Sequence, residues 1–590
     1  RGVTKSLYSS NPDAQGTDSQ GLLAFNSNGY RIGGSSSYNN TNDDYVSWTF
    51  RKQPGFFDIV TWDGNGTSGR AISHNLGSVP GMIIVKSYQH PGGVGNTDWL
   101  VYHRGLNGGT NPHNYGTLLN TTGTENAQAW WNNTAPTSTQ FEVNASQDIN
   151  GSGGKYVAYL FAHDAQDFGT DSDEAIIKCG SFTTTSTWGN FKEDLGFEPQ
   201  WLLVKRTDST DNWGIVDMMR GVTGPGEMAL TDTSTMFSAT SASDDQELQA
   251  NSSAAESTQG RGGFYSQGYL GNFGGFANAT YIYVAIRRPH KPASEFAATD
   301  LFAIDTRSAS NPGFTSGFPV DFQIYKSTSG SDGYLTNRLT GNKSLLANST
   351  AAEGTLVSDG NGDFDYNTGW MDSTANISTL YSWMFRRAPE FFDVVAYNGD
   401  GTNGRTVTHN LGVTPEMIIV KNRSTAENWF VYHSATGATK ATYLNTTSAT
   451  ATSTGFWNDT APTSSVFSTY SAFTNVGGQN YIAFLFATVP GISKVGSYTG
   501  TGASLDIDCG FTNGARLVLL RRTDTVGNWF LWDTARGIVA GNDPYLLLNS
   551  DAAQSTGNDY IDPYSAGFNL TGGGSSINGA GGSFIFLAIA

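Results

Sequence analysis

The sequence has few charged residues and no concentration of positive charge. Charged residues make up 14% of the 590-residue chain, against about 25% in average soluble proteins. Its 33 Lys and Arg residues are scattered and are outnumbered by 51 Asp and Glu residues, so no basic surface is expected to neutralise phosphates. This balance argues against nucleic acid as a partner.

Long apolar runs and paired cysteines are also missing. The longest apolar runs, such as Met82 to Val85 and Phe584 to Ala590, are far shorter than the ~20 residues that span a bilayer. Membrane insertion is therefore not expected. The two cysteines, Cys179 and Cys509, are 330 residues apart, and their arrangement predicts neither a structural disulfide nor a metal-ligand spacing.

What the chain has instead is glycine, serine, threonine and asparagine, including 72 glycines. Gly and Asn suit tight turns, and Thr fits a half-buried strand. Runs of four to seven apolar residues are bounded by turn clusters such as Asp63-Gly-Asn-Gly66, and no helical periodicity of ten or more residues is found. These patterns predict an all-β protein.

One pattern recurs along the chain and divides it into copies. The segment FFDIVTWDGNGTSGRAISHNLGSVPGMIIVK, from Phe56, returns as FFDVVAYNGDGTNGRTVTHNLGVTPEMIIVK from Phe391, an offset of 335 residues. Fainter relatives start at Leu195 and Cys509. In each, an apolar strand ends in Lys or Arg, and a polar turn leads to Trp and a second strand. The Trp positions are Trp99, Trp213, Trp429 and Trp529, and Tyr334 takes this place in a divergent copy.

Each copy ends in an aromatic closing strand, and the copies follow the order C, A, B, C, A, B, where A is the FFD type. Because the Trp recurs at a fixed position, each copy should bury its own Trp-centred interior. With about 100 to 125 residues per copy, the expected fold is a tandem of antiparallel β-sandwiches, jelly-roll or concanavalin-like, in a C-A-B super-repeat. The predicted domains are residues 1–53 (second half of a C copy), 54–166 (A), 172–290 (B), 297–388 (C), 389–489 (A) and 491–590 (B).

The first closing strand, residues 45–50, has no complete copy before it. Arg1 and Gly2 align with Arg536 and Gly537, in the middle of the repeat. The chain is therefore expected to begin halfway through a domain whose first half lies upstream or is supplied by something else. Prolines at several junctions, such as Pro54 and Pro389, should hold neighbouring copies in a fixed relation, as a rod or a block.

These motifs resemble repeated domains in structural proteins of marine tailed phages, including cyanophages, often described as tail-fibre or lectin-like. The matching pieces are FFDIVTWDGNGTSGR, HNLGSVPGMIIVK, NWGIVDMMRG and YVSWTFRKQPGFFD, and together the repeats cover nearly the whole chain. The resemblance implies a concanavalin-like sandwich and a virion location. It carries over no catalytic or binding residue.

Histidine is the usual general base, and two pairs occupy equivalent repeat positions: His74 with His409, and His103 with His433. In the B copies the second pair is replaced by Asp217 and Asp533. A catalytic group rarely changes its chemistry between duplicated domains, so structural hydrogen bonding or local ion pairing is the favoured interpretation. No catalytic motif is present, and we expect no enzymatic activity. A glycosidase carboxylate pair has no local signature and stays open.

One segment could bind calcium. Asp359, Asn361, Asp363 and Asp365 alternate as in the first half of a calcium loop. The second half does not fit, because position twelve is Trp370 where an EF-hand needs Glu. An ordinary solvated hairpin is the competing interpretation, and no other cofactor is expected.

Two tryptophans are candidates for contact with a glycan. Trp stacks on sugar rings, and most Trp residues here recur at core positions of the repeat. Trp130 and Trp370 sit among polar turn residues, with no equivalent recognised in the other copies. Half-buried packing is the alternative for both.

The sequence thus favours a non-enzymatic structural protein of a virus particle, a tail fibre or other appendage on the virion surface, that contributes to host attachment. Expected partners are other virion proteins and a host-surface glycan, and homo-oligomerisation is expected without a defined order. The alternatives are a bacterial cell-surface or secreted adhesin with carbohydrate-binding sandwiches, and a glycan depolymerase.

Overall fold

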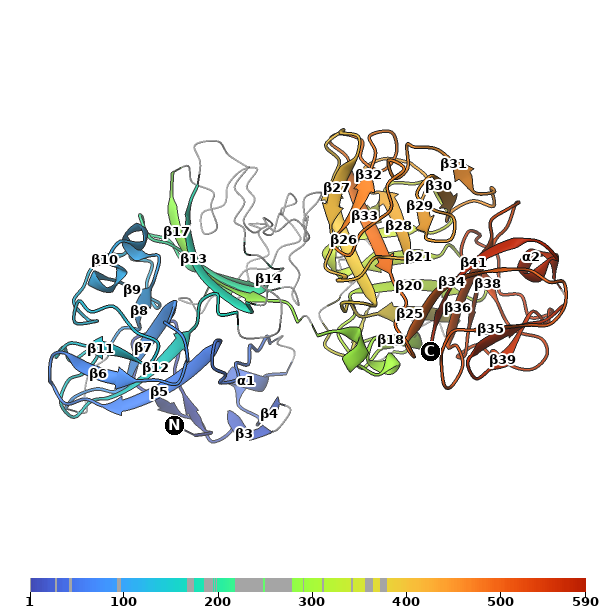
Figure 1. The fold of residues 1–590 in the computed structure, drawn as a ribbon. Helices are drawn as coiled ribbons and strands as arrows, with labels where there is room; N and C mark the ends of the chain where they lie inside the picture. Colours follow the sequence, from blue (N-terminus) through green and yellow to red (C-terminus); the bar gives the residue numbers. More distant parts are fainter. Residues whose placement is uncertain are drawn as a thin grey trace. The chain divides into compact units, whose positions relative to one another are not determined.

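In a computed structural model of the chain, the regular secondary structure of the described residues consists almost entirely of antiparallel strands (Figure 1). The described residues up to 288 form one compact unit and those from 289 onward form another. The predicted fold class, tandem antiparallel β-sandwiches, is confirmed. The structure describes residues 2–26, 29–41, 45–92, 97–166, 175–184, 195, 197, 199–217, 248–249, 278–289, 291–309, 312–340, 343–355, 364, 366–371, 379–572 and 574–590.

Helical structure is confined to single turns among these residues, and none of the helices is long and apolar enough to cross a membrane. The helices are α1 (Ser36–Asn39), α2 (Ser575–Asn578), η1 (Leu106–Gly109), η2 (Pro112–Asn114), η3 (Ala293–Glu295), η4 (Ala298–Asp300) and η5 (Arg338–Thr340).

The complete C copy is a sandwich of a six-stranded and a two-stranded sheet. The closing strand β25 pairs on both sides with β18 and β20, which explains why it is apolar at most positions. In sheet order, the large sheet contains β18 (Phe302–Thr306), β25 (Leu380–Phe385), β20 (Phe322–Ser327), β21 (Tyr334–Asn337), β22 (Lys343–Leu346) and β23 (Gly354–Thr355), and the small sheet contains β19 (Phe314–Thr315) and β24 (Gly369–Trp370).

The two A copies share one strand order. Their predicted Gly turns are required by close packing, because a Cβ on Gly399 would lie 2.0 Å from the Val476 carbonyl oxygen. The first A copy contains β10 (Asn126–Ala127), β9 (Tyr115–Leu118), β8 (Leu100–His103), β7 (Met82–Gln89), β12 (Lys155–Phe161) and β5 (Phe57–Asp63), with β11 (Gln140–Val143) paired to β6 (Arg70–Ser73). The second contains β26 (Phe392–Asn398), β33 (Asn480–Phe486), β28 (Met417–Asn422), β29 (Phe430–His433), β30 (Lys440–Tyr443) and β31 (Ala451–Thr452), with β27 (Arg405–Thr408) paired to β32 (Val466–Thr469).

The B copies each have a five-stranded large sheet, and in the second B copy a three-stranded sheet faces it. The first contains β13 (Ile177–Thr183), β17 (Thr280–Arg287), β14 (Pro199–Arg206), β15 (Trp213–Asp217) and β16 (Leu248–Gln249). The second contains β34 (Ser493–Thr499), β41 (Ser583–Ile589), β36 (Leu517–Arg522), β37 (Trp529–Asp533) and β38 (Leu546–Leu547), with β35 (Leu505–Asp508), β40 (Gly567–Leu570) and β39 (Ile561–Tyr564) in the small sheet.

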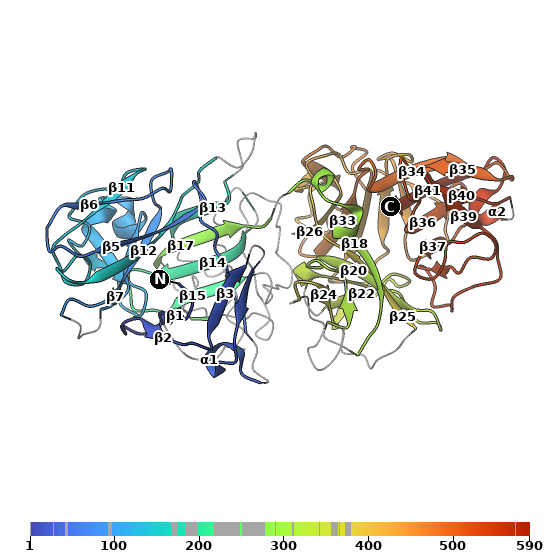
Figure 2. The same ribbon diagram turned by 90° about the horizontal axis from the view of Figure 1, so that it is seen from below.

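The described part of residues 1–53 contains β1, β2, β3 and α1, labelled in Figure 2, and its strand pairing resembles that of the second half of the C copy. Strands β1 (Lys5–Ser6) and β2 (Gly16–Thr17) pair as β22 and β23 do, and β3 (Leu22–Asn26) forms a hairpin with β4 (Gly29–Ile32). The prediction of a closing strand at 45–50 is wrong, because these residues belong to no sheet. Their counterpart β25 pairs with β18 and β20, and the described part of residues 1–53 includes neither strand.

The three copies of the second unit contact one another in equivalent ways, and we call each of these contact regions a joint. At each joint, a buried cationic side chain of one copy donates a hydrogen bond to a backbone carbonyl of another copy. The contacts are Lys326 Nζ to the Ser550 oxygen (2.8 Å), Lys421 Nζ to the Thr350 oxygen (3.0 Å) and Arg521 Nη1 to the Thr446 oxygen (2.6 Å). Because C donates to B, A to C and B to A, the contacts close a ring of three copies.

The cations remain charged at neutral pH although they are buried. Burial lowers the pKa of both Lys326 and Lys421 to about 8 and the pKa of Arg521 to about 10. A buried charge is costly unless hydrogen bonds replace its water shell. The carbonyl oxygens of the neighbouring copy supply those bonds, so each copy depends on the next.

The recurring Trp residues lie at the same joints. Trp429 Nε1 donates to the Leu346 oxygen of the C copy, and Trp529 Nε1 donates to the Tyr443 oxygen of the A copy, both at 2.9 Å. Both indoles are buried, as predicted. The prediction that each copy buries its Trp in its own interior is wrong, because a Trp whose indole N–H bonds a neighbouring backbone joins two copies.

The first unit repeats the joints from A to C and from B to A. Trp99 Nε1 donates to the Tyr8 oxygen, and Lys86 Nζ donates to the Pro12 oxygen at 2.7 Å. Trp213 Nε1 donates to the Leu118 oxygen at 2.9 Å. The described part of residues 1–53 therefore contacts its A neighbour as the complete C copy does.

Each copy of the second unit also has its own apolar interior. In addition, the three large sheets share an apolar centre, to which Phe322 and Trp383 come from the C copy, Phe486 from the A copy, and Leu519 and Leu587 from the B copy. The sandwiches are thus separate in their interiors and joined at this centre.

Candidate functional site

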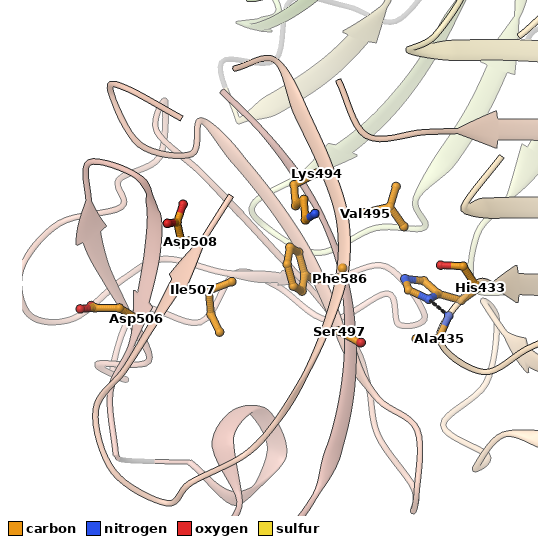
Figure 3. A pocket seen from close by; sticks show the side chains of 11 residues that line it. His433, Ala435, Lys494, Val495, Ser497, Asp506, Ile507, Asp508 and Phe586 are labelled. Atoms are coloured by element: carbon orange, nitrogen blue, oxygen red, sulfur yellow. Dashed lines mark hydrogen bonds between the residues drawn. The ribbon is translucent and has the colours of Figure 1, made fainter. Parts of the chain in front are cut away.

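A groove of about 550 Å³ lies where the A and B copies of the second unit meet. The turn after β29 forms one side, and β34, β35 and Phe586 of β41 form the other (Figure 3). A volume of this size lies within the usual range for small-ligand sites.

The rim of the groove is charged. Asp506 and Asp508 alternate on β35 and are exposed, and Ile507 between them is buried, as the two-residue period of a strand requires. Asp506 Oδ1 accepts a hydrogen bond from Asn569 Nδ2 at 2.7 Å, and Asp508 Oδ1 accepts one from the Gly510 N–H at 2.8 Å. These bonds orient the two carboxylates.

Hydrogen-bond donors complete the lining. Lys494 on β34 supplies an ammonium group, and Ser434 and Ser497 supply hydroxyls. Below them the Phe586 ring lies over Gly496, where an added Cβ would come within 2.4 Å of the ring. Carboxylates, an ammonium and hydroxyls above an apolar floor suit a ligand that has both hydroxyl groups and apolar faces.

His433 lines the groove but plays a structural part. Its Nδ1 accepts a hydrogen bond from the Ala435 N–H at 3.1 Å, so Nε2 carries the proton. In the first unit the equivalent His103 bonds the Tyr283 oxygen through Nε2 at 3.0 Å. Burial lowers the pKa of both imidazoles to about 4. His103 thus bonds a strand of the neighbouring B copy, and both imidazoles are buried and neutral, which places them poorly for general-base chemistry.

The other repeat positions singled out in the sequence are also structural. His74 and His409 are buried, and their Nδ1 atoms accept hydrogen bonds from backbone N–H groups two residues on. Asp533 forms a buried ion pair with Arg536 at 2.6 Å and accepts a hydrogen bond from Trp383 Nε1 at 3.0 Å. The ion pairing expected at this position is present.

Of the two predicted glycan contacts, Trp370 is corrected. Its side chain is 0% exposed and stacks on Phe314, and its Nε1 donates to Ser382 Oγ at 3.0 Å. Such a ring has no face to offer a sugar, because the C copy uses it as core.

Trp130 is half-buried and packs against the core of its copy. The WNNTAP and WNDTAP motifs align it with Phe456 in the second A copy, where the side chain is buried. It therefore does have a repeat equivalent, and an aromatic ring at this position serves packing. Contact of Trp130 with a glycan remains a prediction.

The predicted calcium ligands Asp359, Asn361, Asp363 and Asp365 lie outside the described residues. Within the described part of the chain, no group of three or more His, Cys, Asp or Glu side chains is arranged to hold a metal ion. Both cysteines are buried free thiols, as the sequence predicted.

The groove residues were not identified from the sequence. Aligning the repeats would have drawn attention to them, since Asp506 and Asp508 stand where the preceding A copy has Thr406 and Thr408, and Lys494 stands where it has Asp393. The available signal is therefore a change of charge between copies, at positions where the shared fold does not require a charged residue.

A family model described as a domain of unknown function, DUF7483, matches residues 1–286 and 386–590. The chain belongs to the DUF7483 family. The unmatched stretch contains nearly all of the complete C copy, the copy that departs most from the repeat pattern. No curated protein matches the chain.

Proposed function

We propose that this DUF7483 protein is a non-enzymatic structural protein of a virus particle, part of a tail fibre or other appendage, and that it contributes to host attachment. The observation that carries the proposal is the closed joint between copies. Three sandwiches that bond one another through buried cations and indoles make a firm block, and the joints from A to C and from B to A recur in the first unit. Rigidly joined sandwiches suit an extracellular appendage, which needs length and a large contact surface.

The proposed location is the surface of the virion, with other virion proteins as partners and further copies of the chain in a homo-oligomer. Host contact would be the sum of many modest interactions, strengthened by multivalency. No reaction is needed for this role.

We further propose that the groove between the second A and B copies contacts the host-surface glycan. Carboxylates accept hydrogen bonds from sugar hydroxyls and an ammonium donates to sugar oxygens. Asp506, Asp508 and Lys494 supply both kinds of group around one depression.

The virion role is tested by locating the chain on the particle. A gold-labelled antibody against the chain should mark an appendage in electron micrographs of a phage whose genome encodes it. Label confined to bacterial cells that carry the gene would favour the adhesin alternative and contradict the proposal.

The groove is tested with polysaccharide extracted from the envelope of the host cell. The double variant Asp506→Asn, Asp508→Asn should reduce binding of the full chain at least tenfold, whereas Asp559→Asn, an exposed Asp outside the groove lining, should leave it unchanged. Equal binding by both variants would show that the groove does not bind the polysaccharide. Release of new reducing ends from the polysaccharide would favour a depolymerase instead.

A further inference from the structure

In both A copies a carboxylate connects the two sheets of the sandwich at one side. In the second A copy, Asp393 on the edge strand β26 accepts a hydrogen bond from the Asn410 N–H, just beyond β27 of the small sheet, at 2.8 Å. In the first A copy, Asp58 on β5 accepts one from the Asn75 N–H at 2.8 Å. We call this bond from the edge strand to the small sheet the clamp.

The second B copy has lost the clamp. The complete C copy still has one of the same kind, in which Asp305 on β18 accepts the Thr315 N–H of β19 at 2.7 Å. In the second B copy β34 contains no Asp or Glu, and its second residue, the clamp position of both A copies, is Lys494. The Gly510 N–H, which stands where the clamped N–H groups stand, donates instead to Asp508 within the small sheet at 2.8 Å. The groove lies along this unclamped side of the sandwich.

A lysine at the clamp position is common to both B copies. Lys178 is the second residue of β13, as Lys494 is of β34, whereas Asp58 and Asp393 hold this position in the A copies. The strand is kept and the charge is reversed. Because the shared fold does not require a positive charge there, the lysine is free to serve another role.

The Lys494 ammonium lies in the lining of the groove. The two-residue period of a strand places Lys494 on the same face of β34 as Gly496, which pairs with Phe586, and all three residues line the groove (Figure 3). Among the residues that the structure describes, no ion pair or hydrogen bond engages Lys494 Nζ. An ammonium has three N–H donors that need acceptors, so this one is able to donate to the oxygens of a bound molecule.

The edge of β34 adds a backbone donor and acceptor. β34 is the terminal strand of its sheet, so alternate residues direct their N–H and C=O groups outward. Val495 uses both of these groups with the Thr488 hydroxyl, and the same alternation turns those of Ser497 outward within the lining. A donor beside an acceptor matches a sugar hydroxyl, which both donates and accepts.

The placement of the charges favours an uncharged ligand. Asp506 and Asp508 share the exposed face of β35, and Figure 3 shows Asp506 turned away from Phe586. An anionic ligand meets these carboxylates at the rim, and a cationic ligand meets the Lys494 ammonium in the lining. Repulsion of both signs acts against charged ligands, whereas hydroxyl groups bond carboxylates and ammonium alike.

We propose that the groove takes an uncharged sugar unit and that Lys494, released by the loss of the clamp, is a binding residue that donates to the oxygens of this unit. The inference rests on the proposed contact of the groove with a glycan, to which it adds the class of sugar and the residue that recognises it.

The test uses the full chain and host-envelope polysaccharide that has been partly hydrolysed and separated by ion exchange into neutral, acidic and basic oligosaccharides. The neutral fraction should bind more tightly than either charged fraction. Lys494→Met should weaken binding of the neutral fraction roughly tenfold or more, because a charge-assisted hydrogen bond is lost, and Lys494→Arg should largely restore it. The control Lys440→Met replaces an exposed lysine outside the lining and should bind like the original chain.

Tighter binding of a charged fraction than of the neutral one would overturn this inference and leave the glycan contact standing. Equal binding of the neutral fraction by Lys494→Met and the original chain would do the same. If the original chain binds none of the fractions, the proposed glycan contact itself is refuted, and this inference with it.

Discussion

Replacing Trp529 tests whether the recurring tryptophans join copies. This side chain is fully buried in the second B copy, and its Nε1 bonds the Tyr443 oxygen of the A copy. Arg521 lies over the ring, 5.5 Å from its centroid. Trp529→Ala should therefore destabilise the A–B joint as well as the B copy.

The expected loss can be estimated from these contacts. Truncating a buried Trp to Ala costs about 3–5 kcal/mol through lost contacts and the cavity left behind. Trp529→Phe keeps most of the ring and loses the N–H donor, which costs about 1 kcal/mol. The Tyr443 oxygen still accepts a hydrogen bond from Arg521 Nη1 at 2.7 Å. The carbonyl is therefore not left without a donor, and the loss for Trp529→Phe stays near 1 kcal/mol.

Calorimetry measures the Tm of each variant, and limited proteolysis with mapped cleavage sites shows which copies open. A unit of roughly 300 residues unfolds with an entropy near 0.6 kcal/mol per degree, so a loss of about 4 kcal/mol lowers its Tm by about 6 °C. Trp529→Phe should lower it by about 2 °C. Cleavage should open in the A and B copies together in the Ala variant. An unchanged Tm, or cleavage confined to the B copy, would refute the reasoning.

Two further predictions follow from the joints. Deleting residues 54–388 places Trp48 opposite Asp533 in place of Asp217, so the shortened chain should fold and show a cooperative thermal transition; aggregation or loss of the transition would contradict interchangeable copies. Burial lowers the pKa of His103 and of His433 to about 4 in the folded chain, whereas the pKa of an unfolded histidine is near 6.5. Because the unfolded state takes up the proton first, the free energy of unfolding of each unit should fall by up to about 3 kcal/mol between pH 6.5 and pH 4. His433→Asn, which can keep the bond from the Ala435 N–H, should flatten this slope for the second unit in urea titrations, and an unchanged slope would argue against a buried, neutral His433.

The sequence predicted local structure well because strands and turns depend on neighbouring residues. The two FFD segments and the other apolar closing strands form sheet, and the Gly-rich clusters form the connections between strands, since each pattern carries its own periodicity. The closing strand at 45–50 was the exception, since a strand needs partners and its partners are absent from the described part of that copy.

The joints were harder to predict because they depend on residues far apart in the chain. Nothing local distinguishes a Trp buried inside one sandwich from Trp429, whose N–H bonds a strand 83 residues earlier. In the sequence, Lys326 likewise looks like an ordinary lysine near the end of a strand, although its Nζ bonds the Ser550 oxygen 224 residues away. The groove was missed for the same reason, since β35 and the turn after β29 meet only when two copies close.

Hydrogen exchange followed by mass spectrometry tests most directly whether three sandwiches form one cooperative block. In residues 297–590, peptides from β25, β33 and β41 should lose protection together, in a single correlated opening under conditions where exchange outpaces reclosing. Exchange of β41 at its own rate, with β25 and β33 still protected, would mean that the copies unfold separately and that the joints do not hold the block together.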